Sequence, residues 1–246
     1  MADAPNLYVS GQYLENNPRW HEEDSTWKVA AITKMLSRHH LQPSRIAEIG
    51  CGAGQILVEL ANNLDQDVKY SGFDISPQAF EICREKTTDR IAFYLSDMLE
   101  NNSEIFDLAL AIDVFEHVPD YIGFLTKFRA TATNHIFHIP LDIHVSAVIR
   151  ATPFQVARET VGHLHYFTKE TALATLRHAG YQILDSFYTS NALESPSPHR
   201  SLQKKLLRLP RQIAFGLNED LAARVLGGFS LLVLTRQIAF TNVAKL

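Results

Sequence analysis

Short apolar runs alternate with stretches of helical periodicity along most of the chain. The apolar runs predict buried strands near 45–49, 69–73, 91–95, 106–112, 134–139, 181–187 and 229–235. Between them, apolar residues spaced three and four apart predict helices near 25–39, 54–63, 77–86, 120–131 and 168–179. This alternation is typical of an α/β fold built around a mostly parallel sheet.

A glycine-rich turn joins the first predicted strand to its helix. The stretch Ile46–Gly54 reads IAEIGCGAG, and its glycines Gly50, Gly52 and Gly54 permit positive φ, a close ligand or tight helix packing. Glu48 precedes the first glycine by two residues, and the spacing is G-x-G-x-G. Both details favour S-adenosylmethionine over NAD at the helix N-terminus. A turn that only packs the helix on the strand is the alternative.

The E-x-G-x-G-x-G pattern resembles the first motif of class I S-adenosylmethionine-dependent methyltransferases. The resemblance covers most of residues 28–190 and is strongest at 45–54, 69–75 and 106–118. It implies a three-layer α/β sandwich with a mostly parallel, seven-stranded sheet whose last strand is antiparallel. We interpret residues 1–246 as one domain: a Rossmann-like core (28–190 and 229–235), an N-terminal lid (1–27) and an insertion between the last two strands (188–228).

Four predicted strands carry an acidic residue at the carboxyl end. These acids are Glu48, Asp74, Asp97 and Asp113. Because open parallel sheets bind ligands at the carboxyl ends of their strands, we expect these acids to share one site. The position of Asp74 after the second strand favours a contact with the adenosine ribose; the alternative is that Asp74 caps the next helix, which starts at Ser76-Pro77. In the resembled family, an acid at the position of Asp97 binds the adenine amino group; a turn aspartate is the alternative. The expected cofactor contacts are Glu48, Gly50, Cys51, Gly52, Gly54, Asp74, Ile75, Asp97, Met98, Asp113, Val114 and His117.

Histidines are the candidate bases for methyl transfer, since their ordinary pKa lies near neutrality. His163 and His165 flank Leu164 just before a predicted helix. Alternate residues of an extended segment face the same way, so both are expected to point into the cleft. Either is the first candidate for a base or acceptor-binding residue, and His138 is the next. A purely structural role for each histidine is the alternative.

In the resembled family, some members that methylate catechols, quinone precursors or RNA ribose hold a divalent cation through Glu and His near the place of the motif Asp113-x-x-Glu116-His117. Its oxygen and imidazole groups would suit Mg or Mn. The same Glu-His pair also occurs in members of the resembled family that hold no metal. We therefore expect no metal, and activity that survives a chelator.

Two further segments bear on the acceptor. The N-terminal segment mixes aromatic and polar residues; Tyr13, Trp20, Trp27 and Lys28 are its expected cleft contacts, and Tyr13, Trp27 and Lys28 its expected acceptor contacts. The alternative is a helix packed on the sheet with Trp27 as a core anchor.

Residues 199–211 are basic with a leucine stripe, which predicts an amphipathic helix stopped at Pro210. Such a helix faces solvent, binds an anionic acceptor or contacts a membrane surface peripherally.

Composition limits the partners. The chain has 246 residues, 46% of them hydrophobic, and a net charge of −4, which disfavours nucleic acid. It has only two cysteines, no signal peptide and no apolar run long enough to span a bilayer, so a cytoplasmic protein is expected.

These patterns predict methyl transfer from S-adenosylmethionine to a small-molecule acceptor, with S-adenosylhomocysteine as product. Oxygen is the favoured acceptor atom, and an anionic saccharide or natural-product intermediate the favoured acceptor. The alternatives are an NAD-dependent oxidoreductase, a non-catalytic methyltransferase-like binding module and an RNA methyltransferase. The acceptor, the pathway and the oligomeric state stay open.

Overall fold

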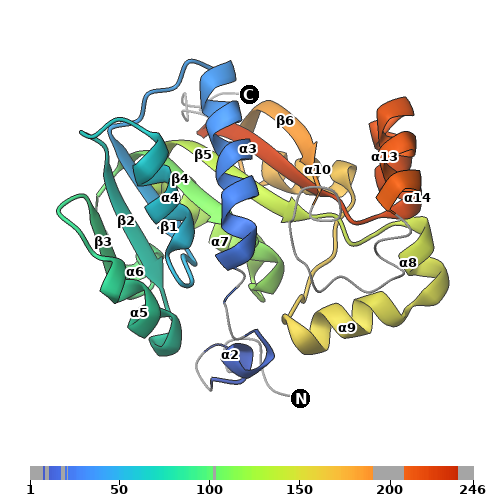
Figure 1. Ribbon diagram of the computed structural model, residues 1–246, viewed down its shortest axis with the longest axis horizontal. Helices are drawn as coiled ribbons and strands as arrows, with labels where there is room; N and C mark the ends of the chain where they lie inside the picture. The colour runs from blue at the N-terminus through green and yellow to red at the C-terminus, as the bar shows by residue number, and fades with distance from the viewer. Residues whose placement is uncertain are drawn as a thin grey trace, which may run out of the picture.

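A single seven-stranded sheet organises the computed structural model, which describes residues 8, 11–17, 20, 22–101, 104–190 and 208–237. The strand order is β3-β2-β1-β4-β5-β7-β6 (Figure 1). The strands are β1 (Arg45–Ile49), β2 (Lys69–Asp74), β3 (Ile91–Leu95), β4 (Phe106–Ile112), β5 (Ala132–Pro140), β6 (Tyr181–Thr189) and β7 (Ser230–Gln237). Strands β1 to β5 pair in parallel, whereas β7 is antiparallel to both β5 and β6. The predicted fold class is confirmed.

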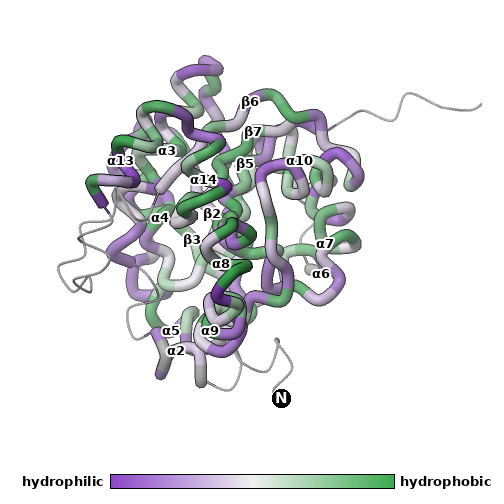
Figure 2. Tube along the Cα trace, turned by 90° about the vertical axis from the view of Figure 1, so that its right-hand side faces the viewer, coloured by the Kyte–Doolittle hydropathy of each residue, from purple (hydrophilic) through white to green (hydrophobic). Residues whose placement is uncertain are grey.

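Helices cover both faces of the sheet. Helices α3 (Ser25–Arg38), α4 (Gln55–Asn63) and α5 (Pro77–Cys83) contribute to one hydrophobic cluster, and α7 (Tyr121–Phe128) and α10 (Lys169–His178) to the other. Strand residues divide between the clusters by alternation: β4 sends Leu108 and Leu110 to the first and Ala109 and Ala111 to the second. Figure 2 shows this hydrophobic character along the central strands.

Three of the predicted helices begin at residues whose side chains cap them. Ser76 accepts a hydrogen bond from the Ala79 amide ahead of α5, Asp120 accepts one from Gly123 ahead of α7, and Thr168 forms a capping box at α10. The predicted ranges 77–86 and 120–131 end in 3₁₀ turns, η2 (Arg84–Lys86) and η4 (Arg129–Thr131), rather than as continuous α-helix. The remaining elements are α2 (Gln12–Asn16), η1 (Glu22–Asp24), α6 (Met98–Asn101), η3 (Phe115–His117), α8 (Val145–Arg150), α9 (Thr152–Thr160), α13 (Arg208–Leu217) and α14 (Glu219–Leu226).

The predicted helix stop at Pro210 is wrong. Helix α13 runs through Pro210 to Leu217, and Pro210 lies in its first turn. Proline is tolerated there because the amide it lacks would have no partner within the helix. The first part of the basic segment, residues 199–207, falls outside the described residues.

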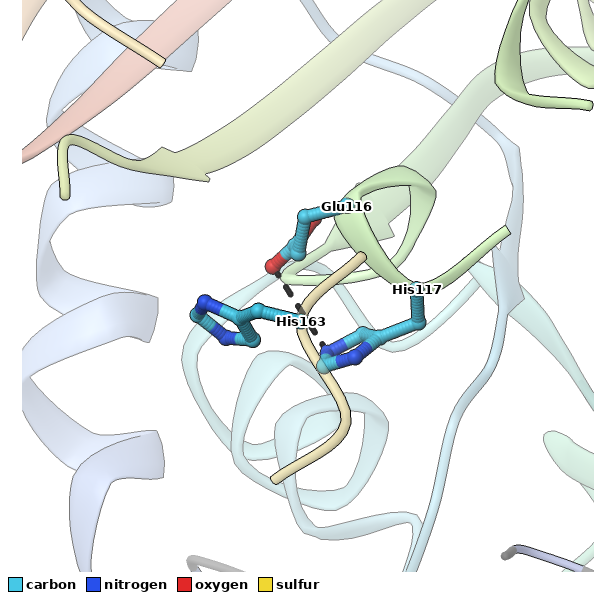
Figure 3. Close-up of side chains that lie close together, drawn as sticks. All are labelled: Glu116, His117 and His163. Carbon is cyan, nitrogen blue, oxygen red and sulfur yellow. Dashed lines mark ion pairs between the residues drawn. The ribbon is translucent and has the colours of Figure 1, made fainter. Parts of the chain in front are cut away.

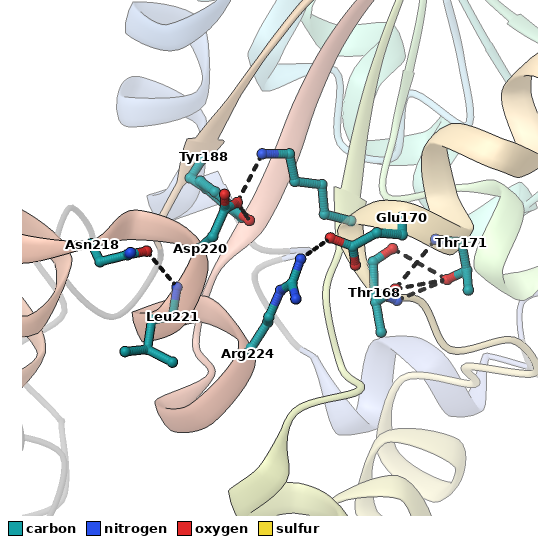
Figure 4. A network of polar contacts seen from close by, with 9 residues as sticks. Thr168, Glu170, Thr171, Tyr188, Asn218, Asp220, Leu221 and Arg224 are labelled. Atoms are coloured by element: carbon teal, nitrogen blue, oxygen red, sulfur yellow. Dashed lines mark hydrogen bonds and ion pairs between the residues drawn. The ribbon is translucent and has the colours of Figure 1, made fainter.

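The insertion packs against the core through a polar network between α14, α10 and β6 (Figure 4). Asp220 Oδ1 accepts hydrogen bonds from Lys169 Nζ at 2.8 Å and from Tyr188 Oη at 2.5 Å. Arg224 forms an ion pair with Glu170 beside them. These contacts fix helix α14, and with it the segment between β6 and β7, against the sheet.

Among the helices that the structure describes, none combines the length and the apolar character needed to span a membrane.

Candidate active site

A cavity of about 500 Å³ lies at the carboxyl ends of the parallel strands. All four predicted strand-end acids line it, together with the first part of the glycine turn. The predicted residues that it brings together are Tyr13, Trp27, Lys28, Glu48, Gly50, Cys51, Gly52, Asp74, Ile75, Asp97, Met98, Asp113, Val114, His117, His138 and His163. Two predicted site residues, Gly54 and His165, are not part of the lining.

The glycine turn presents its backbone to the cavity. Gly50, Gly52 and Gly54 have φ values of 65°, 53° and 76°, a region that favours glycine. Gly54 does not line the cavity, and a Cβ there would lie 2.5 Å from a Phe93 ring atom, so its expected contact with the cofactor stays a prediction. Gly54 therefore serves the close packing of helix on strand, whereas a Cβ on Gly52 would point at Trp20 in the cavity wall.

Asp74 connects the glycine turn to the next helix. Its Oδ2 accepts from the Gly52 amide and its Oδ1 from the Ser76 amide, both at 2.8 Å. Burial raises the pKa of Asp74 even though these amides act to lower it. The helix cap itself is Ser76, so the carboxylate of Asp74 keeps acceptor capacity towards the cavity.

The other two cofactor-side acids differ in their surroundings. Asp97 Oδ1 accepts from the Leu99 amide at 2.8 Å, which matches the turn role, and Met98 beside it is buried in the cavity wall. Glu48 is almost wholly buried and its Oε2 has no hydrogen-bond partner among the described residues. Burial raises the pKa of Glu48 well above the ordinary range, with Lys28 opposing this effect.

Asp113 is the centre of a charged chain at the end of β4. Its Oδ2 lies 2.8 Å from Lys28 Nζ, its Oδ1 lies 2.5 Å from His138 Nδ1, and His138 Nε2 lies 2.8 Å from Thr189 Oγ1. Burial acts to raise the pKa of Asp113, but His138 and Lys28 outweigh it and hold that pKa well below its usual value. Asp113 has φ 56°, a conformation that aspartate tolerates better than most residues.

The engaged nitrogens of His138 count against its predicted role as a base. Both ring nitrogens have partners and the side chain is buried, so the ring is placed to orient Asp113, and a catalytic role for His138 stays a prediction. Trp27 packs edge-on to this ring at 5.5 Å, and its Nε1 donates to Asp24 Oδ1. Trp27 thus lines the cavity and also packs into the core, and its contact with the acceptor stays a prediction.

The expectation that His163 and His165 both face the cleft is wrong for His165. Its Nε2 lies 3.0 Å from the Val118 carbonyl oxygen and its ring lies against Tyr121. The amides of Leu164 and His165 both donate to the Glu116 carbonyl, so the segment bends and does not keep strand alternation. His163 does line the cavity, and its Nδ1 lies 2.7 Å from Asp142 Oδ2.

Glu116, His117 and His163 gather beside the cavity (Figure 3). One ligand-type atom from each lies within 4.8 Å of the others. Glu116 is fully buried, and burial followed by the charge of Asp113 raises its pKa well above the ordinary value. Burial and the neighbouring His163 lower the pKa of His117 to about 4, which keeps its ring neutral at pH 7.

Aromatic residues of the N-terminal segment lie across the cavity. Tyr8 and Tyr13 have ring centroids 4.8 Å apart, and Tyr13 and Trp20 are 4.7 Å apart. Tyr8 is held at both sides, since its hydroxyl donates to the Val161 carbonyl and its carbonyl accepts from Ser76 Oγ. In Figure 1, α2 lies beneath the strand ends, away from the rest of the core.

The sequence interpretation missed three residues that contact the site: Tyr8, Asp142 and Thr189. Tyr8 carried a weak signal as an aromatic residue in the expected lid. Asp142 and Thr189 carried none, because each contacts a histidine that is distant along the chain.

Comparison with known proteins identifies the family. A family model described as a methyltransferase domain matches residues 20–186. The ubiquinone biosynthesis O-methyltransferase of Methylocella silvestris is 29% identical over 117 residues, which cover 40% of this chain and 44% of that protein. This chain therefore aligns with less than half of that relative's length.

Solved structures share the fold. The N-methyltransferase NodS from Bradyrhizobium japonicum WM9, in complex with S-adenosyl-L-homocysteine, has a TM-score of 0.55 at 17% identity, covering 86% of each chain. A putative methyltransferase complexed with the Haloferax volcanii Trm112 activator has a TM-score of 0.66 at 13% identity, covering 98% of this chain and 100% of that chain. Because the matched family model spans well over half of the sequence, the chain belongs to the methyltransferase domain family.

Proposed function

We propose that the chain transfers a methyl group from S-adenosylmethionine to a hydroxyl oxygen of a small aromatic acceptor. The observation that carries this proposal is the convergence of four strand-end acids around one cavity with aromatic walls. Those acids are Glu48, Asp74, Asp97 and Asp113. The first-choice acceptor from the sequence, an anionic saccharide, suits this lining poorly because its charge would face carboxylates.

The residues present fit S-adenosylmethionine better than NAD. Both the sulfonium and the α-amino group of S-adenosylmethionine are cationic, which suits an acidic cavity. The diphosphate of NAD would need free backbone amides in the glycine turn, but three of these amides already donate hydrogen bonds within the protein. Cys51 donates to the Phe73 carbonyl, Gly52 to the Asp74 carboxylate and Gly54 to the Cys51 carbonyl. We assign the ribose to Asp74 and the adenine to the side of the cavity formed by Ile75, Asp97 and Met98.

The protein's own residues would align the acceptor and exclude water. S-adenosylmethionine supplies a methyl group on a sulfonium, and attack by the acceptor oxygen breaks the carbon–sulfur bond with the electron pair left on sulfur. The rings of Tyr8, Tyr13 and Trp20 close the cavity on the N-terminal side and would stack with an aromatic acceptor. His163 is the predicted catalytic histidine that lines the cavity, and it would accept the proton that the acceptor hydroxyl loses.

The relative from Methylocella silvestris supports an oxygen acceptor, since its name describes O-methylation in ubiquinone biosynthesis. Neighbours whose names describe N-methylation share only the fold with this chain at 17% identity, and they carry less weight for the acceptor atom. The basic helix α13 supplies no residue to the cavity lining, so it adds no support for an anionic acceptor.

The test is calorimetric titration of the purified protein with S-adenosylmethionine and, separately, with NAD. We expect micromolar S-adenosylmethionine binding that is lost in Asp74→Ala, and no heat with NAD. Methyl transfer is then measured with phenols and catechols against anionic sugars and amines. Heat with NAD, or silence with S-adenosylmethionine, would overturn the cofactor; a preference for sugars or amines would overturn the acceptor.

A further inference from the structure

We infer that one face of the molecule, formed by α8, α13 and α14, docks on the surface of an anionic lipid membrane. We call this surface the apolar face, and the docking is peripheral, with the helices lying along the membrane rather than crossing it. Vesicle binding does not depend on the proposed function, because it involves neither S-adenosylmethionine nor the acceptor. The exposed residues of the apolar face are Val145, Val148 and Ile149 of α8, Leu209, Ile213 and Leu217 of α13, and Leu221 and Val225 of α14.

The apolar face gathers most of the large apolar side chains that are exposed. Of thirteen such side chains among the described residues, eight belong to it. Ile149 is 79% exposed and Leu217 is 82% exposed, so both side chains lie almost entirely in water. Isolated exposed apolar residues are normal on a protein surface, whereas a group of them on adjoining helices marks a surface that contacts an apolar partner.

Helix α13 carries an apolar stripe on the side that faces water. Leu209, Ile213 and Leu217 are spaced four residues apart, so they follow one side of the helix. Ala214 and Phe215 pack on the core from another side, and no residue of α13 is fully buried. The amphipathic helices of a globular domain turn their apolar stripe towards the core. The exposed stripe of α13 thus lacks an apolar partner within the described part of the chain.

The three helices are fixed to one another at the Leu226 carbonyl of α14. This oxygen accepts hydrogen bonds from Ser146 Oγ of α8 at 3.4 Å and from Arg211 Nη2 of α13 at 3.5 Å. His144, which caps α8, packs so closely on Gly227 that a Cβ there would lie 2.2 Å from the imidazole ring. In Figure 1 the three helices lie together at the right-hand edge, and Figure 2 turns this edge towards the viewer. The apolar face is therefore the surface of one packed unit.

The charges beside the apolar face select an anionic surface. Helices α8 and α13 carry Arg150, Arg208 and Arg211 and no acidic residue, although the whole chain has a net charge of −4. The stretch 199–207, which precedes α13 in the sequence, adds three basic residues and no acid. Basic residues next to exposed apolar side chains are the pattern of helices that lie in the headgroup region of membranes with anionic lipids.

A second copy of the chain matches this surface less well. Two copies that met face to face would bring the arginines of α8 and α13 against one another, which costs free energy. The acids of α14 do not offset this charge, because Asp220 is paired with Lys169 and Glu219 is the only other acid on that helix. Lipid phosphates, in contrast, accept hydrogen bonds from guanidinium groups while the acyl chains receive the apolar side chains.

The test is cosedimentation of the full-length protein with vesicles of phosphatidylcholine alone and of phosphatidylcholine mixed with phosphatidylglycerol. We expect binding to the mixed vesicles that is about tenfold weaker or more with phosphatidylcholine alone, and that falls with added salt. Ile213→Gln should weaken the binding about fivefold, and the triple variant Leu209→Gln, Ile213→Gln, Leu217→Gln about 100-fold. Arg150→Gln combined with Arg208→Gln should weaken it about tenfold.

Ile105→Gln is the matched control for Ile213→Gln. Ile105 is 66% exposed, against 57% for Ile213, and it lies outside the apolar face. This control should bind the mixed vesicles as the wild-type protein does. Glutamine is a good helix former, so the α13 variants should keep their fold, and circular dichroism checks each of them.

Three results would overturn the docking: no binding of the wild-type protein to the mixed vesicles, equal binding to both kinds of vesicle, or equal losses in Ile213→Gln and Ile105→Gln. A wild-type dimer that the triple variant loses, measured by analytical ultracentrifugation without vesicles, would also overturn it, because the apolar face would then belong to a second copy. Titration with S-adenosylmethionine tests the proposed function separately from all of these results.

Discussion

Lys28 on α3 and Asp113 at the end of β4 form an ion pair of 2.8 Å that joins the N-terminal part of the chain to the centre of the sheet. The pair is largely buried, with the two side chains 12% and 29% exposed. Burial acts to lower the pKa of Lys28, but Asp113 outweighs it and raises that pKa, so the lysine stays charged. The position of Asp113 therefore depends on a residue that precedes the sheet in sequence.

We expect Lys28→Met to weaken both stability and cofactor binding. Removing one partner leaves Asp113 with His138 alone, which should cost about 1–3 kcal/mol of unfolding free energy after allowance for the partial exposure of the pair. Urea unfolding and S-adenosylmethionine titration measure the two effects. Lys34→Met on the exposed side of the same helix is the control. Equal results for the two variants would contradict a special role for the pair.

Gly54→Ala should destabilise the fold by about 2–4 kcal/mol, since it combines a positive φ with overpacking against Phe93. Gly216→Ala is the matched control, because a Cβ there meets no atom within 4 Å and the residue lies in helix α13. It should stabilise by about 0.5–1 kcal/mol. Thermal unfolding compares both with wild type; a neutral Gly54→Ala would mean that Phe93 moves aside.

His135 should make the protein sensitive to mild acid. Its ring is fully buried, its Nε2 lies 3.0 Å from the Phe128 carbonyl oxygen, and burial lowers the pKa of His135 from 6.5 to about 4. The folded state thus favours the neutral ring. The free energy of unfolding that this preference contributes is complete above the unfolded pKa and is lost as pH falls from 6.5 towards 4. The loss at about pH 5 should be about 2 kcal/mol.

The variant His135→Phe isolates that contribution. Urea unfolding of both proteins at about pH 7.5 and about pH 5 should show a smaller acid-induced loss in the variant, by about 2 kcal/mol. Other buried histidines contribute equally to both proteins and cancel in the difference. An identical pH dependence in the two proteins would show that His135 does not titrate with folding.

Tyr8→Phe should loosen the aromatic segment over the cavity. It removes the hydrogen bond from the Tyr8 hydroxyl to the Val161 carbonyl, worth about 0.5–1.5 kcal/mol. We expect up to about a tenfold rise in the dissociation rate of S-adenosylmethionine, measured by stopped flow. Tyr70→Phe is the control, because the Tyr70 hydroxyl is buried without a hydrogen-bond partner among the described residues. An unchanged rate would mean that the segment does not gate the cavity.

The sequence predicted the sheet well because each central strand is a short apolar run bounded by breakers, as in Ile46 to Gly50. It predicted the strand-end acids because strand direction alone places them at one edge. Local periodicity could not locate α8 and α9, which contain few buried residues and so carry no apolar stripe towards a core. The bend at Leu164, which turns His165 away from the cavity, depends on the distant Glu116 carbonyl and left no trace in the sequence.

The antiparallel direction of β7 has a consequence for how this protein can change. Thr189 at the end of β6 pairs with Ser230 at the start of β7, so the excursion between them leaves and re-enters the sheet at a single point. That point adjoins the cavity, because Ser230 is part of its wall. The segment between these two positions can therefore gain or lose residues without a change of register in any strand. A change of length in this excursion would therefore leave the strands that carry Glu48, Asp74 and Asp113 in place.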